Sequence, residues 1–587
     1  MIKIKNEDDI FLFYIWRNIF LKNVILNSLR ESNKSYSISI KTNKELLNFK
    51  FRQYIKHLFY CSNEIFSIGD IPPSVKSLTF GNEFNQMIIP GSIPQSVQSL
   101  TFGENFNQEI SVGSIPPSVQ HLTFGKNFNG KIYSDSLPSS IKSITFGHFF
   151  NKKLSTEIIP FGVESLTFGH CYNKILSPGS VPSSIKHLTF GYCFNRKISI
   201  PLGLESLTLG YNFNQVISPG SIPTSVKSLT FTGPYYQKLL PGLIPSSVQT
   251  LILSLWNQQI FEDSIPPSVT SLTFSNLFDQ RVSIPSSVTS LNICEKLYKR
   301  IYKFSSLSNI RSLAIDRQHD PHLSEFPIPP NVKSLRLGCD HNQKLYPGFI
   351  PFGVESLTFG NNFNRPLFLG SIPSSVKSLE FGKYFNQPLL PDLIPSGVES
   401  LKFGSHFNQI LIQNSIPPTV KSLTFGNNFN QNLTQYSIPS SIETLEFGDQ
   451  FNKQILEHTI PPSVQTLKFG LSFNQILKKG SIPSSIKSLT FGENFCNSLS
   501  FVPSSVKLLT LGKHFGLNQP VECELIPPSV EFLTFTSGFS FVLPKNSIPS
   551  SVRSLTFHDD FNKVLSQDSI PSSVFYFKSG DDKNDGE

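Results

Sequence analysis

One pattern of apolar and polar residues recurs along most of the chain, and residues 415–430 show it most clearly as SIPPTVKSLTFGNNFN. Leu423 and Phe425 stand two residues apart, so both point to one face of an extended strand, whereas Ser422 and Thr424 point to the other. The remaining apolar positions of this copy are Val420, Phe429, Leu433 and Ile438. The pattern predicts one short strand and one irregular return leg in each copy.

Aligning the strand leucine places 24 copies between Leu78 and Phe577, most of them 22 residues apart. A single copy is too short to bury its own apolar face, but stacked copies pair their strands and join their apolar positions into continuous columns. We therefore expect residues 67–577 to form a β-rich solenoid with one parallel sheet of about 24 rungs. The few shorter or longer copies should change the return leg and leave the strand intact.

Both ends of the chain lack the repeat. In residues 1–66, Asp8 or Asp9 can cap a helix that continues to about Arg30, and a second helix is expected from Glu45 to Tyr60. We interpret this region as a helical N-terminal cap over the first rung, or alternatively as a docking region of the F-box kind. Residues 578–587 are expected to be a disordered acidic tail.

Composition and charge narrow the function classes. No run of 18 apolar residues exists, so we expect no membrane span. The seven cysteines form no disulfide framework, which favours a cytoplasmic, reducing compartment. The net charge is +9, but residues 1–66 alone carry 11 Lys/Arg against 6 Asp/Glu. The repeats are close to balanced, and Lys and Glu alternate in the column two residues before the strand leucine, as in Lys333, Glu355 and Lys377. This alternation predicts charge ladders and argues against a nucleic-acid partner.

The repeated pattern I-P-x-S-V-K-S-L-T-F-G-x-x-F-N resembles the FNIP repeat, a relative of the leucine-rich repeats. The resemblance covers about residues 67–577 and implies a leucine-rich-repeat-like solenoid in a family that mostly lacks assigned biochemistry. An Asn recurs seven residues after the strand leucine, for example at Asn107, Asn129 and Asn430. Stacked Asn side chains can satisfy backbone groups of neighbouring turns, so we interpret this column as structural.

Candidate chemistry is sparse. Residues 125–132 mimic a phosphate-binding G-x-x-x-x-G-K motif, but Ile132 stands where Ser or Thr is required and no helix pattern follows. In the irregular middle of the chain, His319 and His341 replace the inward Phe of two successive copies. The Asp, His and Cys residues beside them are Asp316, Asp320, His322, Cys339 and Asp340. Such a cluster could bind a transition metal, but its spacing matches no known site, so we predict no metal site and no cofactor.

We therefore predict a non-catalytic scaffold that binds a protein partner through a solenoid surface. The alternative is an F-box-like substrate adaptor of a ubiquitin ligase, with a ligase scaffold bound through residues 1–66. Specific binding needs residues that occur once, and aromatic or Arg anchors usually carry most of the energy. These concentrate where the repeat is least regular, which gives the predicted partner-binding residues Tyr235, Tyr236, Trp256, Arg300, Tyr302 and Arg311.

Overall fold

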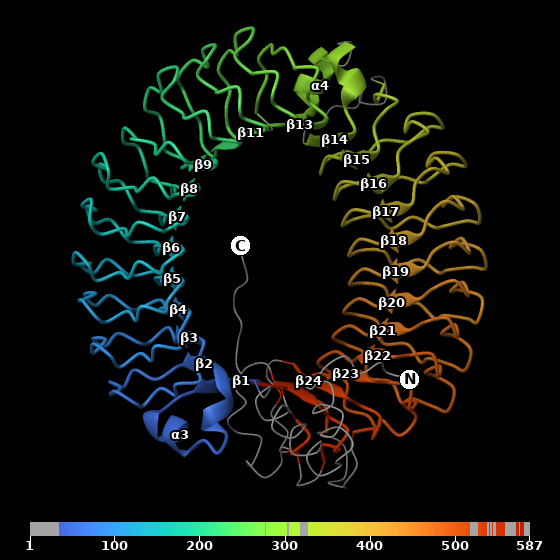
Figure 1. Ribbon diagram of the computed structural model, residues 1–587. Helices are drawn as coiled ribbons and strands as arrows, with labels where there is room; N and C mark the ends of the chain where they lie inside the picture. Colours follow the sequence, from blue (N-terminus) through green and yellow to red (C-terminus); the bar gives the residue numbers. More distant parts are fainter. Residues whose placement is uncertain are drawn as a thin grey trace, which may run out of the picture.

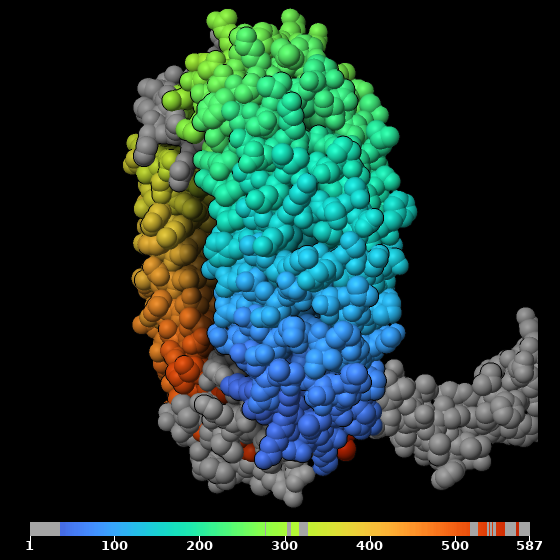
Figure 2. Space-filling model, turned by 90° about the vertical axis from the view of Figure 1, so that its left-hand side faces the viewer, coloured from blue at the N-terminus to red at the C-terminus, as the bar shows by residue number. Residues whose placement is uncertain are grey.

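A computed structural model shows a closed ring of repeats with a parallel sheet along its inner side (Figure 1). It describes residues 35–275, 277–301, 305–316, 327–516, 526–536, 539, 543, 547–557, 571–574 and 576–579. The strands line the hole of the ring, and the return legs form its outer wall. Turned on its side, the ring is a deep band whose outer wall is built by successive repeats (Figure 2).

The strands are β1 Ser35–Ile40, β2 Ile55–Tyr60, β3 Ser77–Phe80, β4 Ser99–Thr101, β5 His121–Thr123, β6 Ser143–Thr145, β7 Ser165–Thr167, β8 His187–Thr189, β9 Ser206–Leu209, β10 Ser228–Phe231, β11 Thr250–Leu253, β12 Ser271–Phe274, β13 Ser290–Cys294, β14 Ser312–Asp316, β15 Ser334–Leu337, β16 Ser356–Thr358, β17 Ser378–Glu380, β18 Ser400–Lys402, β19 Ser422–Thr424, β20 Thr444–Glu446, β21 Thr466–Lys468, β22 Ser488–Thr490, β23 Leu508–Leu511, β24 Phe532–Phe535, β25 Ser554–Phe557 and β26 Tyr576–Ser579. The helices are α3 Asn43–Asn48 and α4 Glu295–Ile301, with 3-10 turns η1 Arg52–Tyr54 and η2 Ser305–Asn309. Each of the 24 expected strands is present, as β3 to β26, which confirms the predicted solenoid. The shorter and longer copies keep their strands, also as expected.

The core consists of the predicted apolar columns. Leu423 and Phe429 are fully buried, and Phe425 is 2% exposed. The Phe425 ring stacks on Phe429 of its own rung, with centroids 4.0 Å apart, and on Phe447 of the next rung at 5.5 Å. Two aromatic columns therefore run through this part of the core and tie each rung to the next.

The turn after the strand lies very close to the same turn of the preceding rung. At Gly426 an added Cβ would lie 1.8 Å from the carbonyl oxygen of Gly404 in the preceding rung. Gly426 does not have a positive φ. The glycine of the repeat is therefore required because there is no room for a side chain between rungs, and not because the turn needs a left-handed backbone.

The Asn column satisfies backbone donors, as predicted. The Asn430 amide N–H donates to the Asn408 side-chain oxygen at 2.9 Å, and Asn107 bonds Asn85 in the same way at 2.9 Å. Every further link of this kind joins one rung to the rung before it. Where the Asn recurs, the turn is thereby fixed to its neighbour by a side chain that the repeat supplies.

Residues 35–60 differ from the expected helical cap. The helix α3 is short, with Thr42 accepting from the Glu45 backbone N–H at its start. The expected helix from Glu45 to Tyr60 is wrong beyond Asn48, because residues 55–60 form β2 and bury Ile55, Leu58 and Tyr60. Pairing with strands on both sides outweighs the local helical spacing of these residues. The helix expected from Asp8 or Asp9 to about Arg30 lies outside the described residues.

The ring closes because β1 pairs with β26 as well as with β2, in parallel register. In the described part of the chain, every strand has a neighbour on both sides, so no sheet edge is left open. Residues 576–579 form β26, and thus Lys578 and Ser579 belong to the sheet and not to the expected acidic tail. The remainder of that tail lies outside the described residues.

Candidate partner-binding surfaces

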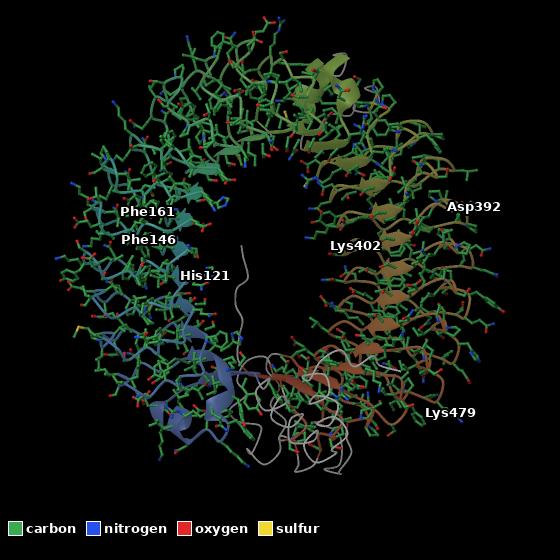
Figure 3. All side chains as sticks on the ribbon, in the orientation of Figure 1. His121, Phe146, Phe161, Asp392, Lys402 and Lys479 are labelled. Atoms are coloured by element: carbon green, nitrogen blue, oxygen red, sulfur yellow. The ribbon has the colours of Figure 1, made fainter. Side chains whose placement is uncertain are left out.

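The inner face of the ring carries hydroxyl groups and alternating charges. Figure 3 shows His121 and Lys402 pointing to this side, whereas Asp392 and Lys479 lie on the outer wall. The predicted charge ladders are confirmed: Glu164 lies between Lys142 at 3.6 Å and Lys186 at 2.8 Å. The hydrogen bond from Lys186 holds the pKa of Glu164 below its usual value. Because the pairs are exposed, they set the register between rungs and contribute little stability.

A second ladder shows the same alternation along the other half of the ring. Lys333 and Lys377 lie 2.9 and 3.7 Å from Glu355, and the hydrogen bond from Lys333 lowers the pKa of Glu355. In the column one residue after the strand leucine, Lys402 pairs with Glu380 at 2.6 Å. In these columns opposite charges neutralise each other, so they present no patch of one sign to a polyanion.

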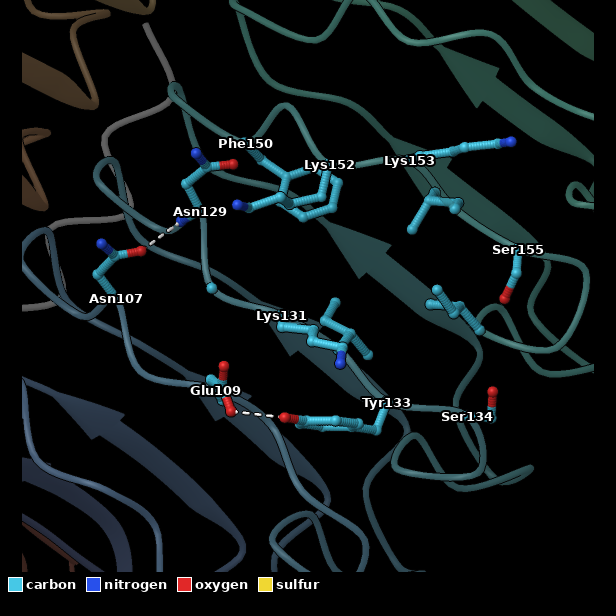
Figure 4. Close-up of a pocket in the computed structure, with 14 residues that line it drawn as sticks. Asn107, Glu109, Asn129, Lys131, Tyr133, Ser134, Phe150, Lys152, Lys153 and Ser155 are labelled. Carbon is cyan, nitrogen blue, oxygen red and sulfur yellow. Dashed lines mark hydrogen bonds between the residues drawn. The ribbon is translucent and has the colours of Figure 1, made fainter.

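A hollow of about 820 Å³ opens on the ring between the return legs that follow β4, β5 and β6 (Figure 4). At the hollow the leg after β5 lies against the preceding leg, where Ile110 and Ile132 make a parallel β-bridge. Gly130 permits this approach, since a Cβ there would lie 2.3 Å from the Gln108 carbonyl oxygen.

The hollow contains three lysines and one carboxylate. The Tyr133 hydroxyl donates to Glu109 at 2.8 Å, and this bond raises the pKa of Tyr133. The Lys131 ammonium lies 4.1 Å from the centroid of the same ring. Lys131 thus covers Tyr133, and the next element after residues 125–132 in this described stretch is the strand β6 and not a helix.

The structure separates the predicted partner-binding residues into buried and exposed groups. Tyr235 and Trp256 are 1% and 0% exposed, so they cannot act as surface anchors, and this part of the prediction is wrong. They fill the aromatic core column, with ring centroids 4.8 Å apart. Tyr236 is 63% exposed, and Arg300 and Arg311 are also exposed. Tyr302 lies outside the described residues.

Arg300 has a structural contact of its own. It lies in the last turn of α4, which replaces the ordinary return leg after β13, and its guanidinium donates to the Asp279 carbonyl. On the opposite face of α4, Tyr298 is buried and its hydroxyl donates to the Pro327 carbonyl at 2.7 Å. Arg and Tyr side chains, which made the irregular middle a candidate binding surface, therefore also form structural hydrogen bonds there.

An exposed apolar column that the sequence analysis missed follows the outer wall. In four successive return legs the position eleven residues after the strand leucine is apolar and exposed. Its members are Tyr346 at 58%, Phe368 at 40%, Leu390 at 58% and Ile412 at 47%. The rings of Tyr346 and Phe368 stack with centroids 6.2 Å apart, so these two members of the column are in contact between rungs. We call these four residues the outer apolar column. Alignment of this column in the sequence would have revealed its apolar run.

His341, at which we predicted no metal site, is a buried residue. His341 is 8% exposed, and its ring lies between Phe349 and Phe363, in the core column that Phe occupies elsewhere. Burial lowers the pKa of His341 to about 4, and its Nε2 has no hydrogen-bond partner among the described residues. His319, Asp320 and His322 lie outside those residues, so their expected proximity to His341 is not described.

A histidine and a serine of neighbouring strands lie close together on the inner face. The His121 Nδ1 atom lies 2.9 Å from the Ser143 hydroxyl, which is the spacing of a base and a nucleophile. Within the described ring, however, no carboxylate is hydrogen-bonded to His121 to orient its ring. His121 is exposed and Ser143 is partly buried, and the pair continues the hydroxyl ladder of the neighbouring strands.

A model of the FNIP repeat matches residues 63–105, 106–149, 150–193, 194–234, 235–277, 256–296, 341–384, 385–428, 429–472, 473–514 and 539–578. An FNIP repeat-containing protein of Dictyostelium discoideum is 37% identical over 94 residues. That match spans 14% of this chain and 18% of the relative's length.

Two solved structures extend over most of the chain. CroV588, a circular LRR protein, is 28% identical with a TM-score of 0.49, and the match covers 91% of this chain and 86% of that one. TLR13, solved in complex with ssRNA13, is 14% identical with a TM-score of 0.55 and coverages of 91% and 89%. The second likeness shows that the fold is of the leucine-rich-repeat type. Within the described residues, none of the helices has the length and apolar character needed to cross a bilayer.

Proposed function

Because the chain belongs to the FNIP repeat family, and its repeats close into a leucine-rich-repeat-like ring, we propose that it is a non-catalytic scaffold that binds a protein partner. The observation that carries the proposal is the outer apolar column. Single exposed apolar residues are normal on protein surfaces, but contiguous ones mark interaction sites. In this column four successive rungs each expose a large apolar side chain.

The position of the column suits a partner that lies along the outer wall. The return leg of Leu390 continues to Asp392, which Figure 3 shows on the outside of the ring. Pro347 and Pro391 directly follow Tyr346 and Leu390, and Leu369 beside Phe368 is itself 70% exposed. A partner with an elongated apolar face could therefore contact several rungs at once, with aromatic anchors at Tyr346 and Phe368.

The irregular middle stays a second candidate surface. Tyr236, Arg300 and Arg311 are exposed there and each occurs in a non-repeating context. They do not form the continuous apolar surface that the outer column provides. We propose them as contributors to specificity, and the outer apolar column as the main source of binding energy.

The ligase-adaptor alternative is now restricted to a shorter segment. Residues 35–60 are used to build two rungs of the ring, so they cannot also form a separate docking pair. Of the region predicted to dock, residues 1–34 stay a candidate for recruitment, and they lie outside the described residues. Nothing in the described ring favours this alternative over a plain scaffold.

The experiment compares matched variants of the tagged full chain, expressed in cells of its source organism. Leu390→Asp alters the outer apolar column, and Ile175→Asp alters a 62% exposed residue on the opposite side of the ring. We expect a specific partner whose recovery by quantitative mass spectrometry falls at least about tenfold with Leu390→Asp, as loss of an interface hot spot implies. Recovery should be unchanged with Ile175→Asp. Equal recovery with both variants, at equal melting temperatures, would contradict the proposal.

A further inference from the structure

Two histidines and two cysteines from three consecutive rungs meet where β6, β7 and β8 end. His148 follows β6, His170 and Cys171 follow β7, and Cys193 follows β8. The Nδ1 atom of His170 lies 3.7 Å from the Cys171 sulfur and 3.8 Å from the Cys193 sulfur. Ligand atoms of His148, His170 and Cys171 all lie within 4.8 Å of one another. All four residues are half-buried, and both cysteines are free thiols.

These separations are close to those around a tetrahedral zinc ion. With Zn–S bonds of ~2.3 Å and Zn–N bonds of ~2.0–2.1 Å, neighbouring sulfur and nitrogen ligands lie about 3.6 Å apart. The two measured N···S distances exceed that value by only 0.1–0.2 Å in the metal-free geometry. Thiolate and imidazole are also the ligands that Zn²⁺ prefers in proteins.

The backbone fixes both cysteines in place. The Cys171 N–H donates to the His148 carbonyl and the Cys193 N–H to the His170 carbonyl, each at 2.8 Å. Two earlier rungs carry Asn at the cysteine position, and there the Asn127 side chain donates to Asn105 at 2.9 Å. Replacing that amide ladder by thiols removes a strong side-chain hydrogen bond, and the histidines stand one residue before the cysteine position.

We propose that His148, His170, Cys171 and Cys193 form a binding site for one Zn²⁺ ion on the rim of the ring. Cys171, Cys193 and His170 Nδ1 are the three ligands already in place, and His148 is the fourth. The site is separate from the outer apolar column, so it does not depend on the proposed scaffold function.

Metal binding requires one local rearrangement. The rings of His148 and His170 are stacked, with centroids 4.3 Å apart and planes 9° from parallel, and His170 also stacks on Tyr192 at 4.7 Å. An imidazole binds a metal in the plane of its ring, so two parallel rings cannot both direct a lone pair to one ion. His148 must therefore tilt, whereas His170 can stay on Tyr192. The half-buried position of His148 leaves room for this motion.

A bound cation changes the protonation of the thiols. Burial and the neighbouring Cys193 raise the pKa of the Cys171 thiol, which favours its protonated form in the absence of a metal. A bound cation favours the thiolate and reverses this preference, so coordination by Cys171 releases a proton.

Cobalt substitution tests the proposal on the full chain, purified with a phosphine reductant and freed of metal. Addition of Co²⁺ should produce visible bands of tetrahedral cobalt together with a sulfur-to-cobalt charge-transfer band, saturating at one equivalent. Zn²⁺ should abolish both bands. We expect Cys171→Ser and Cys193→Ser each to remove the charge-transfer intensity largely, and Cys339→Ser, at an exposed thiol elsewhere in the ring, to leave it unchanged. No band with excess Co²⁺, or a band that survives both variants, overturns the proposal.

A second measurement needs no variant and so does not depend on how the substitutions fold. Alkylation of the reduced wild-type protein, followed by peptide mass spectrometry, reports the reactivity of each thiol. One equivalent of Zn²⁺ should slow alkylation of Cys171 and Cys193 at least about tenfold and leave Cys339 unaffected, because coordinated thiolates are shielded. Unchanged rates at Cys171 and Cys193 would overturn the site.

Discussion

Tyr36 of β1 lies in parallel register with Phe577 of β26, although the two residues stand near opposite ends of the chain. Tyr36 also pairs with Ile55 of β2, so β1 joins the last rung to the second. An open solenoid would leave two strands with unpaired backbone groups, which is a common route to aggregation. Closure removes both edges without a separate cap.

Removal of β26 should therefore reopen both edges. A chain that ends after Val574 leaves β25 and β1 each without one neighbour. We expect this truncated protein to self-associate, which size-exclusion chromatography with light scattering would detect as dimers or larger species. A chain that ends after Ser579 keeps β26 and should stay in the state of the full chain. If both truncated proteins behave alike, closure through β26 does not protect the edges.

The inward and outward positions of a strand should differ sharply in tolerance. Leu423 is fully buried between Leu401 and Leu445 of the adjacent strands, whereas Ser422 is partly exposed on the inner face. Leu423→Asp places an unpaired carboxylate in the apolar column and should cost several kcal/mol of stability. Ser422→Asp should change stability by less than about 0.5 kcal/mol. Equal melting temperatures of the two variants would show that the faces are assigned the wrong way round.

The repeat explains why so much of the ring was predictable. A strand leucine every 22 residues with a Phe two positions later, as in Leu423 and Phe425, can be satisfied only by stacking. Closure was not predictable in the same way, because it depends on a small rotation between rungs that accumulates over the whole chain. Residues 35–60 were misread because β2 lacks the repeat and becomes a strand only through its neighbours.

The candidate sites, like the fold, could be predicted only in part from the sequence. Tyr235 and Trp256 occur in irregular rungs, which made them look like surface anchors, but each fills an inward core position. The proposed zinc ligands escaped notice because Cys171 and Cys193 are one repeat apart in sequence. In a solenoid that separation means direct contact, since equivalent positions of successive rungs are neighbours.

The glycine after each strand offers a test of how closely the rungs approach. Gly426→Ala would place a Cβ 1.8 Å from the Gly404 carbonyl oxygen, so the rungs must separate. Gly220 has a φ of +82° and nothing within 4 Å of an added Cβ, so Gly220→Ala meets only backbone strain. We expect Gly220→Ala to cost about 1 kcal/mol and Gly426→Ala at least twice that, measured by denaturant unfolding. The reverse order would mean that conformational freedom, and not space, selects the glycine of the repeat.

Buried His341 should make stability depend on pH. Its pKa is about 4 in the folded ring and close to 6.5 when the chain is unfolded. Between these values the unfolded chain binds a proton that the folded ring does not, so stability is complete above pH 6.5 and falls as the pH drops towards 4. The shift corresponds to about 3 kcal/mol over that interval. Acidic groups titrate near the lower end, so the effect of His341 must be measured as a difference between variants.

His341→Phe supplies that difference, because Phe is the usual residue of this core column and can stack on Phe363. At pH 7.5 the variant should be at least as stable as the wild type. At pH 5 its advantage should grow by about 2 kcal/mol, seen as a rise in melting temperature relative to wild type. His458→Phe changes a histidine whose side chain is 77% exposed and should not reproduce this gain. A difference between His341→Phe and wild type that stays constant from pH 7.5 to 5 would show that His341 is solvated in the folded ring, and that the rung of Leu335 is open to water where the other rungs are packed.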